Sequence, residues 1–219
     1  MKKTFIVIGL GRFGQSVATT IESLKGDVLA VDVNEEEVRK VSESVTRCAI
    51  CDSTSLSALR KLGVADITDA IIAIGDNLQA SILTLMNLKE LGVERITVRI
   101  SNRNYAPIFE RLGADRLVIP EESSGVTLAH SLVSRNVSDY YQIASKYSIV
   151  RMKVGDGFTD KSLVEMDVRN RYDVNIIGIF RRGEFSIPKA ADIVHQGDEL
   201  LVIGENGKVT RFDKYINRT

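Results

Sequence analysis

The chain has 219 residues, 44% of them hydrophobic, and its 29 basic and 29 acidic side chains give a formal net charge of zero. This length suits two domains of unequal size, and zero net charge provides no overall field that would draw the protein to nucleic acid or an anionic membrane. No apolar run approaches the roughly 18 residues that span a bilayer. The short apolar run after residues 1–4 continues into a glycine-rich turn, which disfavours a signal peptide. We therefore expect a cytoplasmic protein without membrane insertion.

A glycine-rich turn follows the first apolar run. Residues 5–8 are typical of a buried strand, and residues 15–24 have the periodicity of a helix. Between them stand three glycines at the G-x-G-x-x-G spacing of a dinucleotide-binding turn: Gly9, Gly11 and Gly14. The first permits the tight bend, the second lets backbone approach a pyrophosphate, and the third lets the helix pack against the strand. The helix N-terminus then offers free N–H groups to the phosphates.

Two side chains near this turn indicate which nucleotides it suits. Asp32 closes a second apolar strand, inside the window of roughly 20 residues where an acidic group accepts hydrogen bonds from a ribose 2′-OH. A carboxylate there repels a 2′-phosphate, which disfavours NADP. Arg12 directly follows the second glycine, where its guanidinium can fork onto a shared pyrophosphate or onto a terminal phosphate of ADP or ATP.

Helical and strand patterns alternate over the next part of the chain. We expect helices at residues 35–44, 56–62, 78–91 and 105–112, and strands at residues 28–32, 45–50, 70–74, 95–100 and 116–119. With residues 5–8 this gives six strands within about 120 residues. Such alternation predicts an α/β fold with a Rossmann-like, doubly wound parallel sheet.

The ligand site of a doubly wound sheet lies beyond the carboxyl ends of its strands. The residues that follow the strands are candidates for that site: Arg12, Asp32, Asp52, Gly75, Asp76, Asn77, Arg99 and Glu121. Polar residues after strands also cap the helices that come next, and Asp52, Asp76 and Asn77 are equally suited to that role.

The pattern changes after a helix expected at residues 121–133. The polar residues Ser134, Arg135, Asn136 and Ser138 mark a boundary that divides the chain into domains at residues 1–134 and 135–219. Beyond it, strand patterns at residues 149–154, 174–180 and 199–203 surround a charged helix at 161–170, and residues 182–184 are typical of a hairpin turn. We expect a small α+β domain, too small for an elaborate substrate pocket unless two copies pair.

Cys48 and Cys51 form the only C-x-x-C of the sequence. A redox pair or half of a zinc site has this spacing, but no second cysteine pair exists, and His130 and His195 are distant in sequence. The pair falls at the end of a predicted strand, whereas a helix N-terminus is what lowers the pKa of a reactive thiol. We expect buried or incidental cysteines, with a redox-sensing role as the alternative.

Several stretches together resemble a known family. With Asp32 they are residues 9–14 (Gly-Leu-Gly-Arg-Phe-Gly), 51–54 (Cys-Asp-Ser-Thr), 73–77 (Ala-Ile-Gly-Asp-Asn), 119–121 (Ile-Pro-Glu), 175–179 (Asn-Ile-Ile-Gly-Ile) and 197–204 (Gly-Asp-Glu-Leu-Leu-Val-Ile-Gly). The whole chain resembles the KtrA/TrkA-type regulatory subunits of bacterial potassium uptake systems, built from an N-terminal and a C-terminal RCK domain. Many relatives have Gly-Asp-Ala-Thr where this chain has Cys51 and its neighbours, so backbone freedom is lost there.

The resemblance implies a nucleotide-sensing subunit that is not an enzyme. It would act on the cytosolic face of a dimeric KtrB- or TrkH-like membrane transporter, as a homo-octameric ring built from dimers. ATP and ADP would compete for the Rossmann site, with ATP activating and ADP inactivating. The resemblance also implies that Arg12 approaches the terminal phosphates, that Asp32 holds ribose, and that Glu121 helps bind a divalent cation such as Mg²⁺ or Ca²⁺.

The expected nucleotide site comprises Gly9, Gly11, Arg12, Phe13, Gly14, Asp32, Asp52, Ser53, Ala73, Ile74, Gly75, Asn77, Arg99 and Glu121. A second site is implied by the many relatives whose C-terminal domain binds cyclic di-AMP between two copies. The matching residues here are Arg169, Asn175, Ile176, Ile177 and Pro188. Arg169 and Asn175 could equally be ordinary residues of a helix surface and a turn.

Two other classes of protein share the glycine spacing and the acidic residue at the end of the second strand. An NAD-dependent oxidoreductase would also use Asp32, so NAD(H) stays an alternative ligand. Hydride transfer needs a proton donor or acceptor beside the substrate, and neither His130 nor His195 follows a strand of the sheet. An NADH-sensing transcription regulator joins a Rossmann unit to a small domain, but zero net charge and the lack of a basic helix-turn-helix argue against it.

Overall fold

The computed structural model describes residues 3–133 and 136–217 of the chain. The chain forms two compact units, residues 1–121 and residues 122–219. The boundary expected between residues 134 and 135 falls outside the described residues. In the described ranges, no helix is both long enough and apolar enough to cross a membrane.

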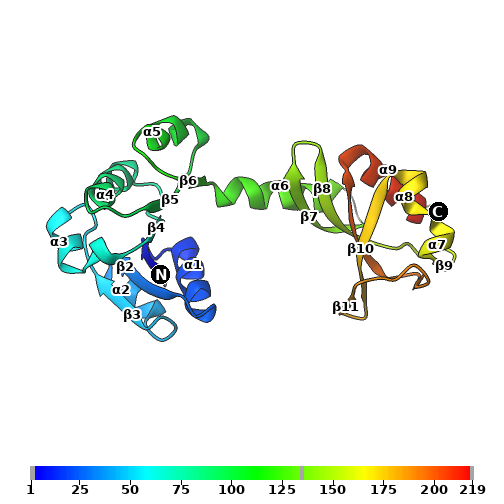
Figure 1. Cartoon of the computed structure of the whole chain (residues 1–219), viewed down its shortest axis with the longest axis horizontal. Coiled ribbons are helices and arrows are strands. Elements are labelled where there is room, and N and C mark those ends of the chain that lie inside the picture. The colour runs from blue at the N-terminus through cyan, green and yellow to red at the C-terminus, as the bar shows by residue number, and fades with distance from the viewer. Residues whose placement is uncertain (1–2, 134–135, 218–219) are drawn as a thin grey trace. The chain divides into compact units, whose positions relative to one another are not determined.

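A parallel sheet of six strands forms the centre of the first unit (Figure 1). The strands are β1 (Thr4–Ile8), β2 (Asp27–Asp32), β3 (Arg47–Ile50), β4 (Asp69–Ile72), β5 (Arg95–Arg99) and β6 (Arg116–Val118). Their order is β3-β2-β1-β4-β5-β6, and every neighbouring pair is parallel. This confirms the predicted Rossmann-like, doubly wound fold. The order reverses between β1 and β4, which is the point at which such sheets bind ligands.

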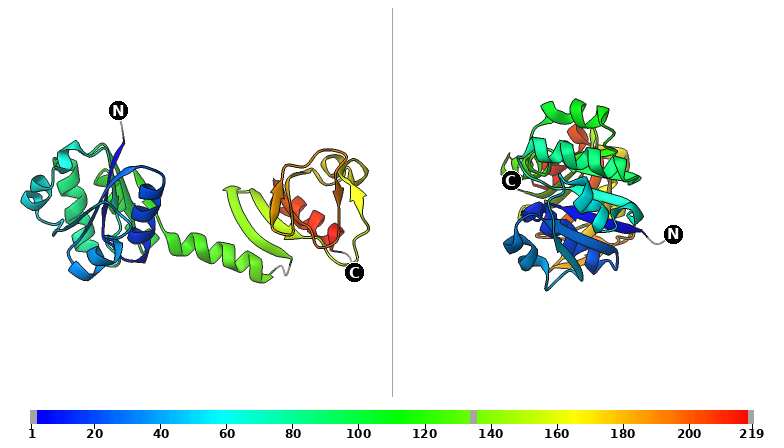
Figure 2. Two further views of the ribbon diagram at one scale, coloured as in Figure 1. Left: turned by 90° about the horizontal axis from the view of Figure 1, so that it is seen from below. Right: turned by 90° about the vertical axis from the view of Figure 1, so that its left-hand side faces the viewer.

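Helices bury both faces of this sheet (Figure 2). They are α1 (Arg12–Ser23), α2 (Glu35–Val41), α3 (Leu56–Lys61), α4 (Leu78–Glu90) and α5 (Ala106–Arg111), with short 3-10 helices η1 (Val64–Asp66) and η2 (Arg103–Tyr105). One core cluster joins α1 and α2 to the sheet, and another joins α3, α4 and α5 to its other face. Burial on both faces explains why the strands are almost continuously apolar.

The second unit is an antiparallel sheet with helices. Helix α6 (Pro120–Val133) leads the chain into it from the first unit. The sheet contains β7 (Val137–Ala144), β8 (Tyr147–Lys153), β10 (Val174–Arg181), β11 (Glu184–Ser186) and β13 (Glu199–Glu205), in the order β11-β10-β13-β8-β7. A separate pair is formed by β9 (Lys161–Ser162) and β12 (Ile193–Val194). Helices α7 (Leu163–Met166), α8 (Val168–Tyr172) and α9 (Asn206–Ile216) complete the unit.

The second unit differs from the sequence prediction in several elements, and the short strands β9 and β12 are among those that were not predicted. Strand β7 and helix α9 were not predicted. The single helix expected at residues 161–170 is two short helices, because Asp167 between them has a left-handed backbone (φ 44°) that an α-helix cannot accommodate. The predicted hairpin turn is present: Arg182 and Gly183 both have positive φ, as a two-residue turn between β10 and β11 requires.

Candidate functional site

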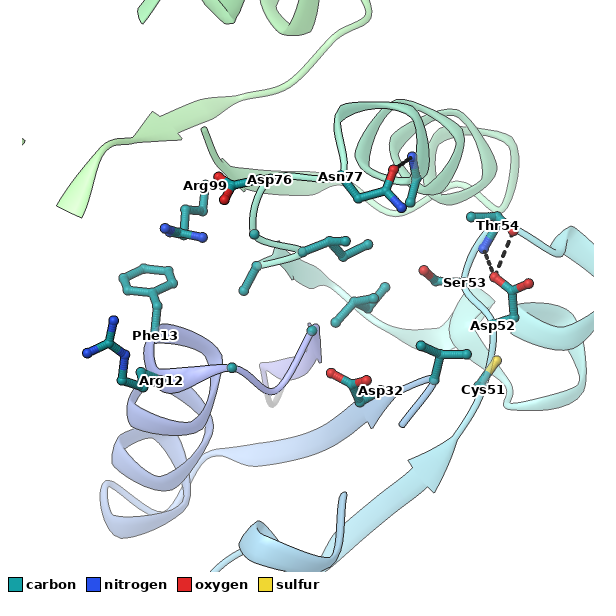
Figure 3. Close-up of a pocket in the computed structure, with 18 of the residues that line it drawn as sticks. Arg12, Phe13, Asp32, Cys51, Asp52, Ser53, Thr54, Asp76, Asn77 and Arg99 are labelled. Atoms are coloured by element: carbon teal, nitrogen blue, oxygen red, sulfur yellow. Dashed lines mark hydrogen bonds between the residues drawn. The ribbon is translucent and has the colours of Figure 1, made fainter. Parts of the chain in front are cut away.

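A cavity of about 970 Å³ opens at the carboxyl edge of the first sheet (Figure 3). It is lined by every residue predicted for the nucleotide site except Gly14. The other lining residues are Ile8, Val33, Cys51, Thr54, Asp76 and Ala80. Strands far apart in sequence therefore deliver the predicted residues to one place, because parallel strands end at the same edge.

The three glycines of the turn have different surroundings. Gly9 has φ of 94°, and a Cβ there would lie 2.7 Å from the carbonyl carbon of Ala73. A Cβ on Gly14 would lie 1.8 Å from the carbonyl oxygen of Gly9, so this glycine lets α1 pack against the turn and does not face the cavity. Gly11 has open space where its Cβ would be. Only Gly11 thus leaves room for a ligand to approach the backbone.

Helix α1 begins at the cavity without a side-chain cap. Gly11 is its N-cap residue, and among the described residues no side-chain cap hydrogen bond is made to the first turn. The helix starts at Arg12, three residues earlier than predicted, which places Arg12 and Phe13 in the first turn and in the cavity wall. Unpaired N–H groups and the helix dipole make this end suited to an anion.

Asp32 is held in place by the backbone on both sides of it. Its Oδ2 accepts a hydrogen bond from Leu10 N at 2.6 Å, and its Oδ1 accepts one from Asn34 N at 2.8 Å. Each carboxylate oxygen can accept a further hydrogen bond. The side chain is therefore fixed at the cavity and retains capacity for a ribose hydroxyl.

The loop from Cys51 to Thr54 is fastened to α4. Ser53 is buried and its Oγ lies 2.7 Å from Thr84 Oγ1, and Asn87 Nδ2 donates to the Ser53 carbonyl at 3.0 Å. Asp52 Oδ1 accepts from the hydroxyl and the N–H of Thr54 at 2.7 and 2.9 Å. These hydrogen bonds, first the hydroxyl and then the N–H, lower the pKa of Asp52.

The capping role weighed for the polar residues after strands applies to Asn77, whereas the N-cap residue of α3 is Ser55 and not Asp52. Asp52 stabilises its own turn, and Asn77 caps α4 by accepting a hydrogen bond from Ala80 N at 3.0 Å. Asp52, Asp76 and Asn77 nevertheless all line the cavity.

Two of the lining residues form an ion pair. Arg99 ends β5 and its Nη2 donates to Glu121 Oε1 in the first turn of α6. The hydrogen bond from Arg99 lowers the pKa of Glu121, with a smaller contribution from the charge of Arg12. In the part of the chain that is described, no group of three or more His, Cys, Asp or Glu side chains could hold a metal ion. A cation at Glu121 would therefore take most of its ligands from elsewhere, such as phosphate oxygens and water.

The two cysteines lie in different environments. Cys48 packs with the core cluster of α1 and α2, whereas Cys51 packs against the cluster on the opposite face of the sheet and also lines the cavity. Burial raises the pKa of both thiols, with smaller contributions from Glu22 and Asp52 respectively. This arrangement disfavours a reactive dithiol and agrees with the expectation of incidental cysteines.

Both histidines lie in the second unit. His130 stacks on Tyr140 with ring centroids 3.5 Å apart, and His195 Nδ1 lies 2.5 Å from Asp160 Oδ2. Neither lines the cavity of the first unit.

Two residues expected at a second ligand site contact each other. Arg169 Nε donates to Asn175 Oδ1 at 2.9 Å, and Ile177 is exposed further along β10. A cavity of about 740 Å³ in this unit is lined by other residues, among them Arg181, Phe185 and Asp192.

Comparison with known proteins identifies both halves of the chain. A model of the TrkA-N domain matches residues 5–120, and a model of the TrkA-C domain matches residues 147–217. The chain belongs to the KtrA/TrkA family. This confirms the resemblance drawn from the sequence motifs.

Relatives in the KtrA/TrkA family match over the whole chain. The Ktr system potassium uptake protein C of Bacillus subtilis (strain 168) is 39% identical over 220 residues, which cover 100% of both chains. The Ktr system potassium uptake protein A of the same organism is 37% identical over 96% of each chain. A solved structure, the GsuK channel bound to NAD, matches 99% of this chain and 39% of its own with a TM-score of 0.66. At 18% identity this last likeness concerns the fold alone.

Proposed function

We propose that this protein senses adenine nucleotides in the first unit and gates a membrane potassium transporter. The observation that carries the proposal is the cavity at the bare N-terminus of α1, where Arg12 and Asp32 stand on either side of the open backbone at Gly11. A site of this kind binds phosphates at the helix and ribose at the carboxylate.

The layout of the cavity matches the parts of an adenine nucleotide. Figure 3 shows Arg12, Phe13 and Arg99 together on one side, Cys51, Asp52 and Thr54 on the opposite side, and Asp32 between them. Phosphates at the arginines would place ribose at Asp32 and the base near Asp52. A divalent cation would be held by Glu121 together with the terminal phosphates, since one or two carboxylates plus phosphate oxygens is a usual Mg²⁺ site.

Gating requires that the two ligands favour different shapes of the assembly. The additional phosphate of ATP, met by Arg12 and by a cation at Glu121, supplies such a difference, with ATP activating and ADP inactivating. The assembly would be a homo-octameric ring on the cytoplasmic face of a KtrB- or TrkH-like transporter. Support for the partner comes from relatives that are potassium uptake proteins and match over 96–100% of their length.

Calorimetric titration with ATP, ADP and NADH tests the ligand. We expect ATP and ADP to bind more tightly than NADH, because Arg12 lies beside the phosphate-binding turn. Micromolar affinity for NADH with negligible affinity for ATP would overturn the proposal in favour of an oxidoreductase or an NADH sensor.

Replacing Arg12 tests how the phosphates are distinguished. Arg12→Ala should weaken ATP more than ADP, because the lost guanidinium contacts the terminal phosphate. Equal losses for both nucleotides would mean that Arg12 contacts only the phosphates they share.

For the second unit we propose cyclic di-AMP binding between two copies, as the matched TrkA-C domain of related proteins suggests. The supporting contact is the hydrogen bond from Arg169 to Asn175 at the start of β10. In calorimetry with cyclic di-AMP, Asn175→Ala should lose affinity, whereas Gln142→Ala on the exposed part of β7 should not. If Asn175→Ala binds cyclic di-AMP as tightly as the wild-type protein does, the proposal is wrong.

A further inference from the structure

A small cavity in the second unit is lined by a lysine and by no acidic residue. Its volume is about 160 Å³, which is room for about five water molecules or for one small molecule of similar size. It is lined by Gly157, Phe158, Thr159, Lys161 and Tyr215. Asp156 and Asp160 belong to the same loop but do not line the cavity. None of the lining residues is part of the nucleotide cavity or of the proposed cyclic di-AMP site, so this is a separate candidate site.

The hydroxyl group of Tyr215 lacks a partner. Its oxygen is buried and forms no hydrogen bond with any described residue. The ring is held by its neighbours, because it stacks on Tyr172 with centroids 5.0 Å apart and meets the edge of Phe158 at 6.1 Å. A buried hydroxyl in this position costs free energy unless a bound molecule supplies the missing hydrogen bond.

The charge around this tyrosine is positive. Lys161 Nζ lies 5.9 Å from the centroid of the Tyr215 ring, and the guanidinium carbon of Arg171 lies 5.6 Å from it. Neither cation forms a salt bridge within the described ranges of the chain. The carboxylate of Glu165 is engaged elsewhere, because its Oε2 accepts hydrogen bonds from the N–H and the hydroxyl of Ser162 at 2.8 and 2.7 Å. An uncompensated ammonium beside a hydroxyl donor is suited to an anion.

The loop that forms the cavity wall is fastened at two points. Gly155 N donates a hydrogen bond to the Ile216 carbonyl of α9 at 3.2 Å. On the other side, Gln196 Nε2 donates to the Phe158 carbonyl at 2.8 Å. Because the wall is held in place before a ligand arrives, binding has little ordering entropy to overcome.

We propose that this cavity binds a small oxyanion of the phosphate class. Lys161 supplies the positive charge, and the hydroxyl of Tyr215 donates a hydrogen bond to one oxygen of the anion. The hydroxyl of Thr159, which forms no hydrogen bond with another described residue, donates to a second oxygen. A tetrahedral oxyanion fits the volume and presents oxygens in several directions, as donors on different walls require. The site belongs to the second unit and does not depend on nucleotide binding in the first.

Calorimetric titration of the full chain with inorganic phosphate tests the site. Lys161→Gln should bind phosphate about tenfold more weakly than wild type, because a charge-assisted hydrogen bond is lost. Lys146→Gln is the matched control, since this exposed lysine of the same unit does not line the cavity, and it should bind like wild type. Arg12→Ala, in the nucleotide cavity, should also keep the wild-type affinity. Phosphate binding that is lost in Arg12→Ala and retained in Lys161→Gln would overturn the inference.

Tyr215→Phe separates binding from structure. The substitution removes only a hydroxyl without a partner, so stability in urea should equal or exceed that of wild type, whereas phosphate affinity should fall about tenfold. Lower stability with unchanged phosphate affinity would show a structural hydroxyl and overturn the inference. Acetate should bind wild type at least about tenfold more weakly than phosphate does, because it offers fewer oxygens and less charge. Equal affinity for acetate, or no phosphate binding by wild type, would also overturn it.

Discussion

Alanine substitutions at two glycines of the turn should affect different properties, one the stability of the fold and the other the affinity for ATP. Gly14→Ala would force a Cβ against the carbonyl oxygen of Gly9, and we expect a loss of about 3 kcal/mol of unfolding free energy. Gly11→Ala meets open space and has an ordinary negative φ, so its stability should stay near wild type. It should nevertheless bind ATP less well, because the methyl group points to where backbone and phosphate meet.

Urea denaturation and ATP calorimetry on both variants check this prediction. A Gly11→Ala protein with full ATP affinity would show that the phosphates do not lie against this residue. A Gly14→Ala protein as stable as wild type would show that α1 can shift away from the turn.

Asp198 should give the second unit a measurable dependence on acid. The side chain is 3% exposed and accepts hydrogen bonds from Arg181 Nε, from Arg181 Nη2 and from His195 N at 2.8–2.9 Å. Burial alone would raise the pKa of Asp198, but these hydrogen bonds hold it below its ordinary value. Asp198→Asn should therefore cost about 2 kcal/mol at neutral pH.

The sign of the pH effect follows from the lowered pKa. A carboxylate with a depressed folded pKa contributes its full stability above its unfolded pKa of about 3.9, and loses it as the pH falls through the folded value. The gap between wild type and Asp198→Asn should thus be constant above about pH 5 and shrink below about pH 4. Tyrosine fluorescence in urea follows this unit, since Tyr105 is the sole tyrosine outside it. If the difference in unfolding free energy between wild type and Asp198→Asn does not shrink at acid pH, the pKa of Asp198 is not lowered in the folded state.

Thr84 in α4 supports the cavity loop although it does not line the cavity itself. Thr84 is fully buried and is the partner of Ser53 Oγ. Thr84→Val keeps the shape but leaves a buried hydroxyl unpaired, which should cost about 1–2 kcal/mol and weaken ATP binding as the loop loosens. Thr20→Val is the control, because its hydroxyl bonds only within α1 on an exposed face. Urea denaturation and calorimetry give both values, and an unchanged Thr84→Val would mean that the loop is held by Asn87 alone.

The elements of the first unit were predictable, whereas those of the second were only partly so. Continuous apolar runs between capped helices identify parallel strands because both sheet faces are buried. The last four residues of strand β7 are all exposed, so the strand lacks a clear alternation of buried apolar and exposed polar residues. Helix α9 does bury Val209, Phe212 and Ile216 at helical spacing, a signal that the sequence contained.

The candidate site, too, was predictable from the sequence only in part. Motif spacing and strand ends predicted Arg12, Asp32 and the glycines. The bonds from Arg99 to Glu121 and from Ser53 to Thr84 join residues 22 and 31 positions apart. They depend on how side chains meet after the strands are placed, which spacing along the chain does not reveal.

Helix α6 should contribute to the assembly of the protein into an oligomer. None of its described residues is buried, although it carries four exposed apolar side chains, Val126, Leu128, Leu132 and Val133. Helical spacing places Val126 and Val133 on one side of α6 and Leu128 and Leu132 on the other, and exposed apolar side chains of this kind are suited to contact with a second copy. Light scattering should show an octamer for wild type and a smaller species for the double variant Leu128→Lys with Leu132→Lys. Leu24→Lys, at an equally exposed leucine of the first unit, should leave the mass unchanged. A monomeric wild type at micromolar concentration would count against the ring.

Strand β1 is made before the other five strands of its sheet but lies in the middle of it, paired with β2 and β4. While the ribosome is still adding residues before Asp69, β1 has a neighbour on one side only and its other backbone edge is bare. During this interval the nascent chain is most prone to pair with a strand of another protein. Pairing of β4 with β1 ends the interval. Synthesis should therefore be least tolerant of pausing in the stretch between β3 and β4.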